Sequence, residues 1–129
     1  MNYKFTIRGT LPGLNELIEA ERRNRYEGAR MKKQCETVVA HSARQLGNVV
    51  FTQPVHMVYH WHEKNRRRDK DNISAFGRKV IQDALVKAGY LLNDGWDNIE
   101  GFEDHFYVDA KQPRIVVEIW ERDETDETG

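Results

Sequence analysis

The segment 71–89 constrains the fold more than any other part of the chain. Its apolar residues recur at three- and four-residue spacing, the pattern of one buried face of an α-helix. Asp71 or Asn72 is placed to cap the start of this helix, and Gly89 is placed to end it. The apolar stripe consists of Ile73, Phe76, Val80, Ile81, Ala84, Leu85 and Ala88. A helix of this kind must bury its stripe against another layer of structure.

Shorter patterns on both sides of this helix predict that second layer. Two further helices are expected, one from Asn15 towards Arg22 and a longer one that follows a break at Gly28 and ends near Gly47. Alternating apolar residues predict strands at 3–8, 55–61, 102–108 and 115–119. The order β-α-α-β-α-β-β predicts an α+β fold, a two-layer domain in which a four-stranded mixed or antiparallel sheet packs with helices.

Length and composition indicate one globular domain. Of the 129 residues, 32% are charged and 39% are hydrophobic. Residues 1–120 are expected to form the domain, and residues 121–129 an acidic, disordered tail. No apolar run is long enough to span a membrane, and the alternation at residues 3–8 is not that of a signal peptide. The single Cys35 excludes an intrachain disulfide framework and favours a reducing, cytoplasmic location.

The net charge of −1 conceals an uneven distribution of charge. Residues 118–129 hold six acidic residues and one basic residue, a net of −5, so the remainder sums to +4. The positive charge is concentrated at 22–33 and 64–70. A basic body with an acidic end is compatible with nucleic-acid binding.

The densest charge pattern is the run Arg66-Arg67-Arg68-Asp69-Lys70-Asp71-Asn72. Its two carboxylates lie one residue apart inside a cluster of cations. Because carboxylates repel each other, a divalent cation that binds hard oxygen ligands, such as Mg²⁺, would explain the pairing, and it would take scissile-phosphate oxygens as further ligands. The arginines would attract a polyanion to that metal. The alternative is a solvated turn of mixed charge.

One edge of the helical stripe carries polar residues that need an explanation. Asn72, Lys79 and Asp83 fall within about 40° of one another around the helix axis. Lys79 and Asp83 are also four residues apart, so they are predicted either to form a surface ion pair or to direct Lys79 towards a metal site with Asp83 orienting it.

These residues together resemble the RusA-type Holliday-junction resolvases, small endodeoxyribonucleases common in phages and prophages. The resemblance covers residues 66–94 and extends more loosely to 11–15 and 117–119. Its motifs are Asp69-x-Asp71-Asn72, then Lys79 and Asp83-Ala84-Leu85, then Lys87-Ala88-Gly89, and finally Asn93-Asp94.

The resemblance implies a homodimer that resolves four-way DNA junctions in a bacterial host cell, with a phage or prophage origin. It implies that Asp69, Asp71 and Asp94 are catalytic and bind Mg²⁺, with Mn²⁺ as the alternative ion, and that Lys79, after a short insertion, assists. Where the family often has paired acids at the third position, this chain has Asn93-Asp94, so Asp94 alone would serve. Contacts to DNA are expected from Arg66, Arg67, Arg68, Lys70, Asn72, Asn15, Arg22, Arg23 and Arg25.

The length of the predicted helix separates the three aspartates within one chain. A helix over 72–88 is about 25 Å long, whereas residues 89–94 span at most roughly 20 Å. Asp94 therefore does not easily return to Asp69 and Asp71 of its own chain. A twofold-related chain with an antiparallel helix would bring its Asp94 there, so we expect a homodimer with two composite sites.

Other interpretations stay open at this level. The chain is alternatively a nuclease for RNA or another DNA structure, or a non-catalytic nucleic-acid-binding or phage assembly protein. His56, His60 and His62 share one strand face, which either holds a transition metal or is an exposed or DNA-facing surface. Trp96, close to Asp94, is a candidate for stacking on bases, while Trp61 and Trp120 are expected in the core or at a dimer contact.

Overall fold

The computed structural model describes residues 2–123, and in them the predicted order of elements is confirmed. The elements are β1 (Asn2–Arg8), α1 (Leu14–Arg23), α2 (Arg25–Ala43), the short 3-10 helix η1 (Arg44–Leu46), β2 (Val55–Glu63), α3 (Lys70–Lys87), β3 (Ile99–Val108) and β4 (Arg114–Glu121).

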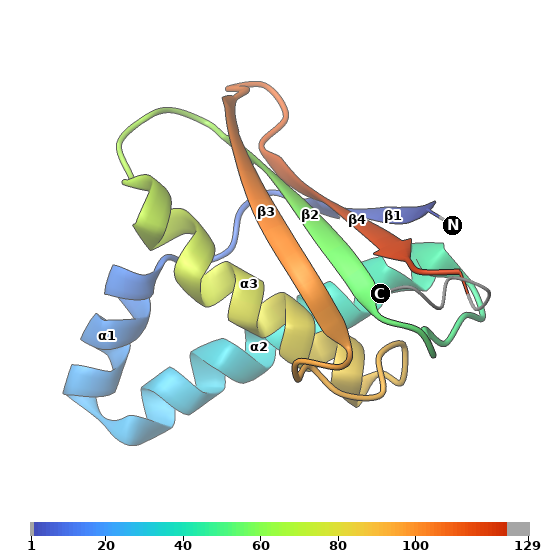
Figure 1. Ribbon diagram of the computed structural model, residues 1–129. Helices are drawn as coiled ribbons and strands as arrows, with labels where there is room; N and C mark the ends of the chain where they lie inside the picture. Colours follow the sequence, from blue (N-terminus) through green and yellow to red (C-terminus); the bar gives the residue numbers. More distant parts are fainter. Residues whose placement is uncertain (1, 124–129) are drawn as a thin grey trace.

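The strands form one mixed sheet in the order β1-β4-β2-β3. β2 and β3 are parallel because α3 carries the chain back between them, while β4 pairs antiparallel with both β1 and β2. The helices cover one face of this sheet (Figure 1). The predicted two-layer α+β fold is therefore confirmed.

The core lies between α2, α3 and the inner face of the sheet. The alternating residues of β2 are fully buried, as predicted, and so is most of the α3 stripe. A Cβ added at Gly77 would lie 2.7 Å from the ring of Trp61, so glycine lets α3 approach β2 closely. Gly89 ends α3 with a φ of 89°, the left-handed conformation expected after a helix. Cys35 is buried in α2.

The structure corrects three predicted helix boundaries. The N-cap of α3 is Asp69, so this helix begins earlier than the predicted cap at Asp71 or Asn72. The N-cap of α1 is Gly13, and Asn15 lies inside that helix. The predicted break at Gly28 is wrong, because the chain turns at Asn24 instead.

Asn24 is extended, with φ −169° and ψ 159°, and its side chain accepts a hydrogen bond from the Glu27 N–H at 3.0 Å. Gly28 lies inside α2, where α1 approaches closely. A Cβ added there would lie 2.5 Å from Cγ of Glu21. The glycine therefore marks a helix contact and does not end a helix.

The predicted boundary between domain and tail is slightly too early. β4 includes Glu121, whose carboxylate accepts hydrogen bonds from the N–H groups of Thr52 and Gln53 at 2.9 and 3.1 Å. The Arg122 N–H donates to the carbonyl of Pro54 at 2.9 Å. Residues 124–129 of the predicted tail lie outside the described residues. Within residues 2–123, no helix is long and apolar enough to cross a membrane.

Candidate functional site

The turn between β2 and α3 is fixed by Arg68. Its guanidinium donates two hydrogen bonds to the Glu63 carboxylate, at 2.9 and 3.0 Å, and one to the carbonyl of Leu11 at 3.0 Å. Glu63 is buried because it continues the inward-facing positions of β2, which the two-residue period of that strand could have indicated. Arg68, predicted to contact DNA, therefore serves as an internal clamp.

A second clamp joins the start of α1 to the start of α3. The side-chain oxygen of Asn72 accepts a hydrogen bond from the Asn15 N–H at 2.8 Å. Gly13 makes room for this contact, because a Cβ there would lie 2.7 Å from the same oxygen. The loop 11–15 and the charged run 66–72 therefore lie side by side, although more than fifty residues separate them in the sequence.

Asp69 and Asp71 lie in the first turn of α3 with exposed side chains. Asp69 occupies the N-cap, yet its carboxylate accepts no capping hydrogen bond, an interaction that usually contributes about 1 kcal/mol. Neither carboxylate has an ion-pair or hydrogen-bond partner among residues 2–123. The exposed side chains of Arg66 and Arg67 have none there either, so opposite charges lie near one another without pairing.

Asp69 opens onto a groove between the start of α3 and the end of β3, which we name the α3–β3 groove. It has a volume of about 670 Å³. Ile73, Phe106 and Val108 give it apolar walls, and Lys70 lies over the Phe106 ring at 5.6 Å from its centroid. The full lining is Glu63, Asn65, Arg66, Arg68, Asp69, Lys70, Ile73, Phe106, Tyr107 and Val108.

The other predicted catalytic residues meet halfway along α3. Nζ of Lys79 lies 3.1 Å from Oδ1 of Asp83 and 3.2 Å from Oδ2 of Asp94, while Lys32 of α2 lies 3.0 Å from Oδ2 of Asp83. Hydrogen bonds to Asp83 and then Asp94 raise the pKa of Lys79. Partial burial raises the pKa of Asp83, but the hydrogen bonds from Lys32 and Lys79 outweigh it and lower that pKa below its ordinary value.

One chain therefore places the predicted catalytic residues in two groups. α3 is unbroken from Lys70 to Lys87, and the loop after it turns back only as far as Lys79. Lys79 lies eight residues beyond Asp71, which is about 12 Å along a helix axis. Among residues 2–123, no three His, Cys, Asp or Glu side chains come close enough to hold a metal ion within one chain.

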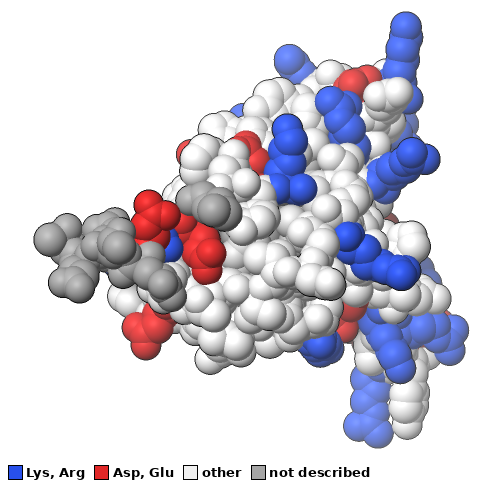
Figure 2. Space-filling view, turned by 90° about the vertical axis from the view of Figure 1, so that its right-hand side faces the viewer, with Lys and Arg blue, Asp and Glu red and all other residues white. Residues whose placement is uncertain are grey.

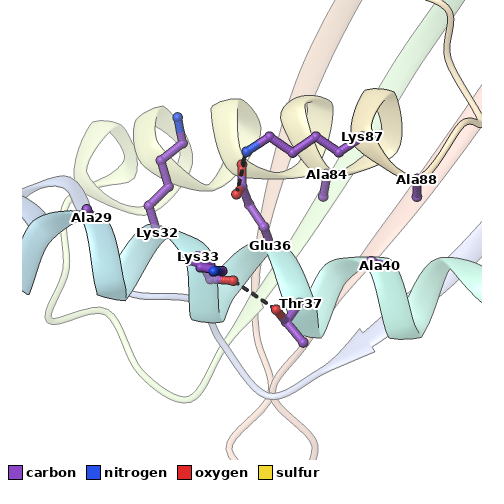
Figure 3. A pocket seen from close by; sticks show the side chains of 9 residues that line it. All are labelled: Ala29, Lys32, Lys33, Glu36, Thr37, Ala40, Ala84, Lys87 and Ala88. Atoms are coloured by element: carbon purple, nitrogen blue, oxygen red, sulfur yellow. Dashed lines mark hydrogen bonds and ion pairs between the residues drawn. The ribbon is translucent and has the colours of Figure 1, made fainter.

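A separate groove of about 490 Å³ runs between α2 and α3. Its floor is formed by small side chains such as Ala40 and Ala84, and Lys33 stands at its rim (Figure 3). Lys87 reaches across from α3 to the buried Glu36, with distances of 2.9 and 3.1 Å to its two oxygens. The ion pair between Lys87 and Glu36 links α3 to α2 across this groove. Glu36, the acidic residue in the lining, is therefore paired, unlike Asp69 and Asp71.

The predicted basic cluster around Asn24 is divided between two helices. Arg23 pairs with Glu19 and Glu27 at 3.3 Å each, and these two acids raise its pKa. Arg25 lies over the ring of Tyr26, and Arg22 is exposed at the end of α1. Across the molecule, Lys and Arg spread over the upper and right-hand parts of one face, whereas Asp and Glu gather at its left (Figure 2).

The three strand histidines lie on the sheet face away from the helices. His60 uses both ring nitrogens within the chain, one towards Glu118 and the other 2.9 Å from the hydroxyl of Tyr107. His62 stacks on Tyr107 at 4.5 Å between ring centroids, and His56 lies 3.4 Å from Glu103. Burial, and then the positive charges of Arg114 and His60, lower the pKa of His62. These contacts link β2 to its neighbouring strands.

No protein-family model matches the chain, and no curated protein matches it. The site must therefore be interpreted from its own chemistry.

Proposed function

We propose that the chain is a Mg²⁺-dependent, dimeric endonuclease that hydrolyses branched DNA, the activity implied by its resemblance to the RusA-type resolvases. The observation that carries the proposal is the pair Asp69 and Asp71. A helix N-cap aspartate normally bonds the helix, and acids beside arginines normally pair with them. Here both carboxylates forgo these partners, as expected for side chains that bind an external ion.

The donors suit a hard divalent cation. Asp69 and Asp71 offer exposed carboxylate oxygens, the ligand type that Mg²⁺ and Mn²⁺ prefer. When bound, such an ion would activate water and stabilise the negative charge that develops on a phosphate. Arg67 and Lys70 flank the two acids and would hold the DNA backbone by charge and hydrogen bonding.

The third acid comes from a second chain in this proposal. Asp94 lies at the level of Lys79, and an antiparallel twofold axis would bring both residues towards the Asp69 and Asp71 of the partner. Lys79 would then enter the site together with Asp94 and steady phosphate charge. The internal clamps at Arg68 and Asn72 keep the first turn of α3 rigid, so the acids are positioned before DNA binds.

A cleavage assay tests this proposal. Labelled four-way junction, duplex DNA, single-stranded DNA and RNA are incubated with the protein in Mg²⁺ or in chelator. We expect paired nicks in the junction that require the metal. Cleavage of RNA would replace the proposal with an RNA nuclease, and metal-independent binding without cleavage of any substrate would contradict nuclease activity altogether.

A further inference from the structure

The loop between α3 and β3 exposes a large aromatic side chain. Trp96 is 98% exposed, and Leu92 in the same loop is 61% exposed. An indole ring carries roughly 150–250 Å² of surface that is costly to leave in water. Tryptophan is enriched in the cores of protein interfaces and among their binding hot spots, so this exposed ring is the part of the loop that fits a contact with another molecule.

The loop is held in shape and does not depend on Trp96 for its structure. The N–H groups of Asn98 and Ile99 both donate to the carbonyl of Gly95, at 3.1 and 2.9 Å, which closes a turn around Trp96. Asp94 is fixed by Lys79 on one side of that turn. Preorganisation of this kind lowers the entropy cost of docking the ring into a partner.

The α3–β3 groove is the complementary feature of the same chain. It combines the apolar walls Ile73, Phe106 and Val108 with the unpaired cation Arg66 at its rim, and Val108 is 52% exposed. Next to Trp96, Asp97 is exposed and has no partner among residues 2–123. The loop therefore offers an aromatic ring next to a negative charge, and the groove offers apolar walls next to a positive charge. The two surfaces are complementary in both respects.

The loop and the groove of one chain lie at opposite ends of β3. The loop precedes Ile99 and the groove includes Val108, so nine residue steps of extended strand, about 30 Å, separate them. Trp96 therefore does not reach its own groove. In an antiparallel pair of chains, each loop faces the other chain's groove, and one twofold axis creates both contacts.

We propose that Trp96 anchors a homodimer by inserting into the α3–β3 groove of a second copy, with Asp97 beside the partner's Arg66. This inference rests on the composite arrangement of the proposed function, because Asp94 lies two residues before Trp96 and Asp69 lines the groove. Docking of the loop would thus bring Asp94 close to the Asp69 and Asp71 of the second copy. The same contact would bury the apolar surface of the interface.

Sedimentation equilibrium without DNA or divalent metal tests the anchor. We expect the wild-type chain to dimerise, and Trp96→Ala or Val108→Glu to raise the dimer dissociation constant by at least about thirtyfold. Trp120 of β4 is 46% exposed on the sheet face away from the helices, so Trp120→Ala should leave the dimer dissociation constant unchanged. A monomeric wild type, or a Trp96→Ala dimer of wild-type affinity, would overturn the inference. Weaker junction binding with an unchanged dimer would also overturn it and assign Trp96 to DNA.

A cross-linking experiment identifies the contact itself. Chains carrying Trp96→Cys and chains carrying Val108→Cys are mixed and oxidised, and we expect a disulfide-linked dimer in the mixture but in neither variant alone. Both variants should unfold at the same temperature as the wild type, which establishes that they fold. Absence of the link in the mixture would contradict the proposed geometry. Because neither measurement involves DNA cleavage, failure of the nuclease proposal would leave a positive result here intact.

Discussion

The two ends of α3 use charged side chains in opposite ways. In the second half of α3 and in the groove between α2 and α3, several charged side chains are paired within the chain. These are Lys79, Asp83, Lys87 and Glu36. In the first turn, Asp69 and Asp71 have no side-chain partner among residues 2–123, although Arg66 and Arg67 are close in sequence. Paired charges satisfy one another and position helices, whereas unpaired charges keep their full capacity for a ligand. The difference supports the proposal that Asp69 and Asp71 in the first turn bind a metal ion.

The largest effect should come from removing an unpaired acid. Asp71→Asn should lower junction cleavage by about a hundredfold or more, because it removes a metal ligand, and it should leave junction binding unchanged or slightly tighter because one repulsive charge is lost. Gel-based cleavage and binding assays at saturating Mg²⁺ measure both effects.

The matched control is Asp83→Asn, which removes a paired acid from the same helix. It should retain at least a tenth of wild-type cleavage, because the ion-pair partners of Asp83 among residues 2–123 are Lys32 and Lys79. An equal loss of cleavage in Asp71→Asn and Asp83→Asn would contradict the proposal that the two ends of α3 have different functions.

A second prediction separates two adjacent arginines. Arg68→Gln should lower the free energy of unfolding by about 2–3 kcal/mol, because it leaves the buried carboxylate of Glu63 without its cation. Arg67→Gln should leave stability unchanged, because the Arg67 side chain is exposed, and should instead reduce the salt dependence of DNA binding by about one ion. Urea unfolding and salt titrations measure these quantities. Reversed results would show that the clamp and the DNA contact had been assigned to the wrong residues.

A third prediction concerns the pH dependence of the paired end. Since the folded pKa of Asp83 lies below its ordinary value of 3.8, its ion pairs stabilise the protein above that pH and lose their effect as pH falls through the lower folded pKa. Asp83→Asn should cost about 1 kcal/mol near neutral pH, and the difference from wild type should shrink below about pH 4. Urea unfolding between pH 3 and 7 tests this; a difference that grows towards low pH would contradict it.

The smallest effect is expected at the N-cap of α3. Asp69→Ala should change the free energy of unfolding by only a few tenths of a kcal/mol, because the Asp69 side chain makes no capping bond. Asn24→Ala at the N-cap of α2 is the matched control and should cost about 1 kcal/mol, since Asn24 does accept such a bond. If thermal unfolding shows equal losses, Asp69 caps its helix and is less available to a metal.

Local patterns in the sequence were sufficient to predict the fold. The α3 stripe, its end at Gly89 and the alternation in β2 depend on residues a few positions apart, so the helix and strand periods reveal them. The turn at Asn24 could not be predicted, because the glycine at the helix crossing, Gly28, looks like a helix breaker until the opposing helix is known.

The site was predicted less completely, because it depends on contacts between distant segments. The two-residue period of β2 could have indicated the buried Glu63, but nothing in the sequence shows that the carbonyl of Leu11, more than fifty residues away, accepts a hydrogen bond from Arg68. Residue spacing likewise does not show that Asp94 returns as far as Lys79. That Asp69 and Asp71 both lie at the start of α3 could be predicted, because one residue separates them.

Subunit mixing tests the composite site most directly. Asp71→Asn and Asp94→Asn chains are each inactive in this account, but their heterodimer would hold one site with both lesions and one site with none. The mixture should therefore nick one strand of a four-way junction after subunit exchange, while paired resolution stays absent. If mass spectrometry confirms the heterodimer and no nicking occurs, each site closes within a single chain and the composite arrangement is wrong.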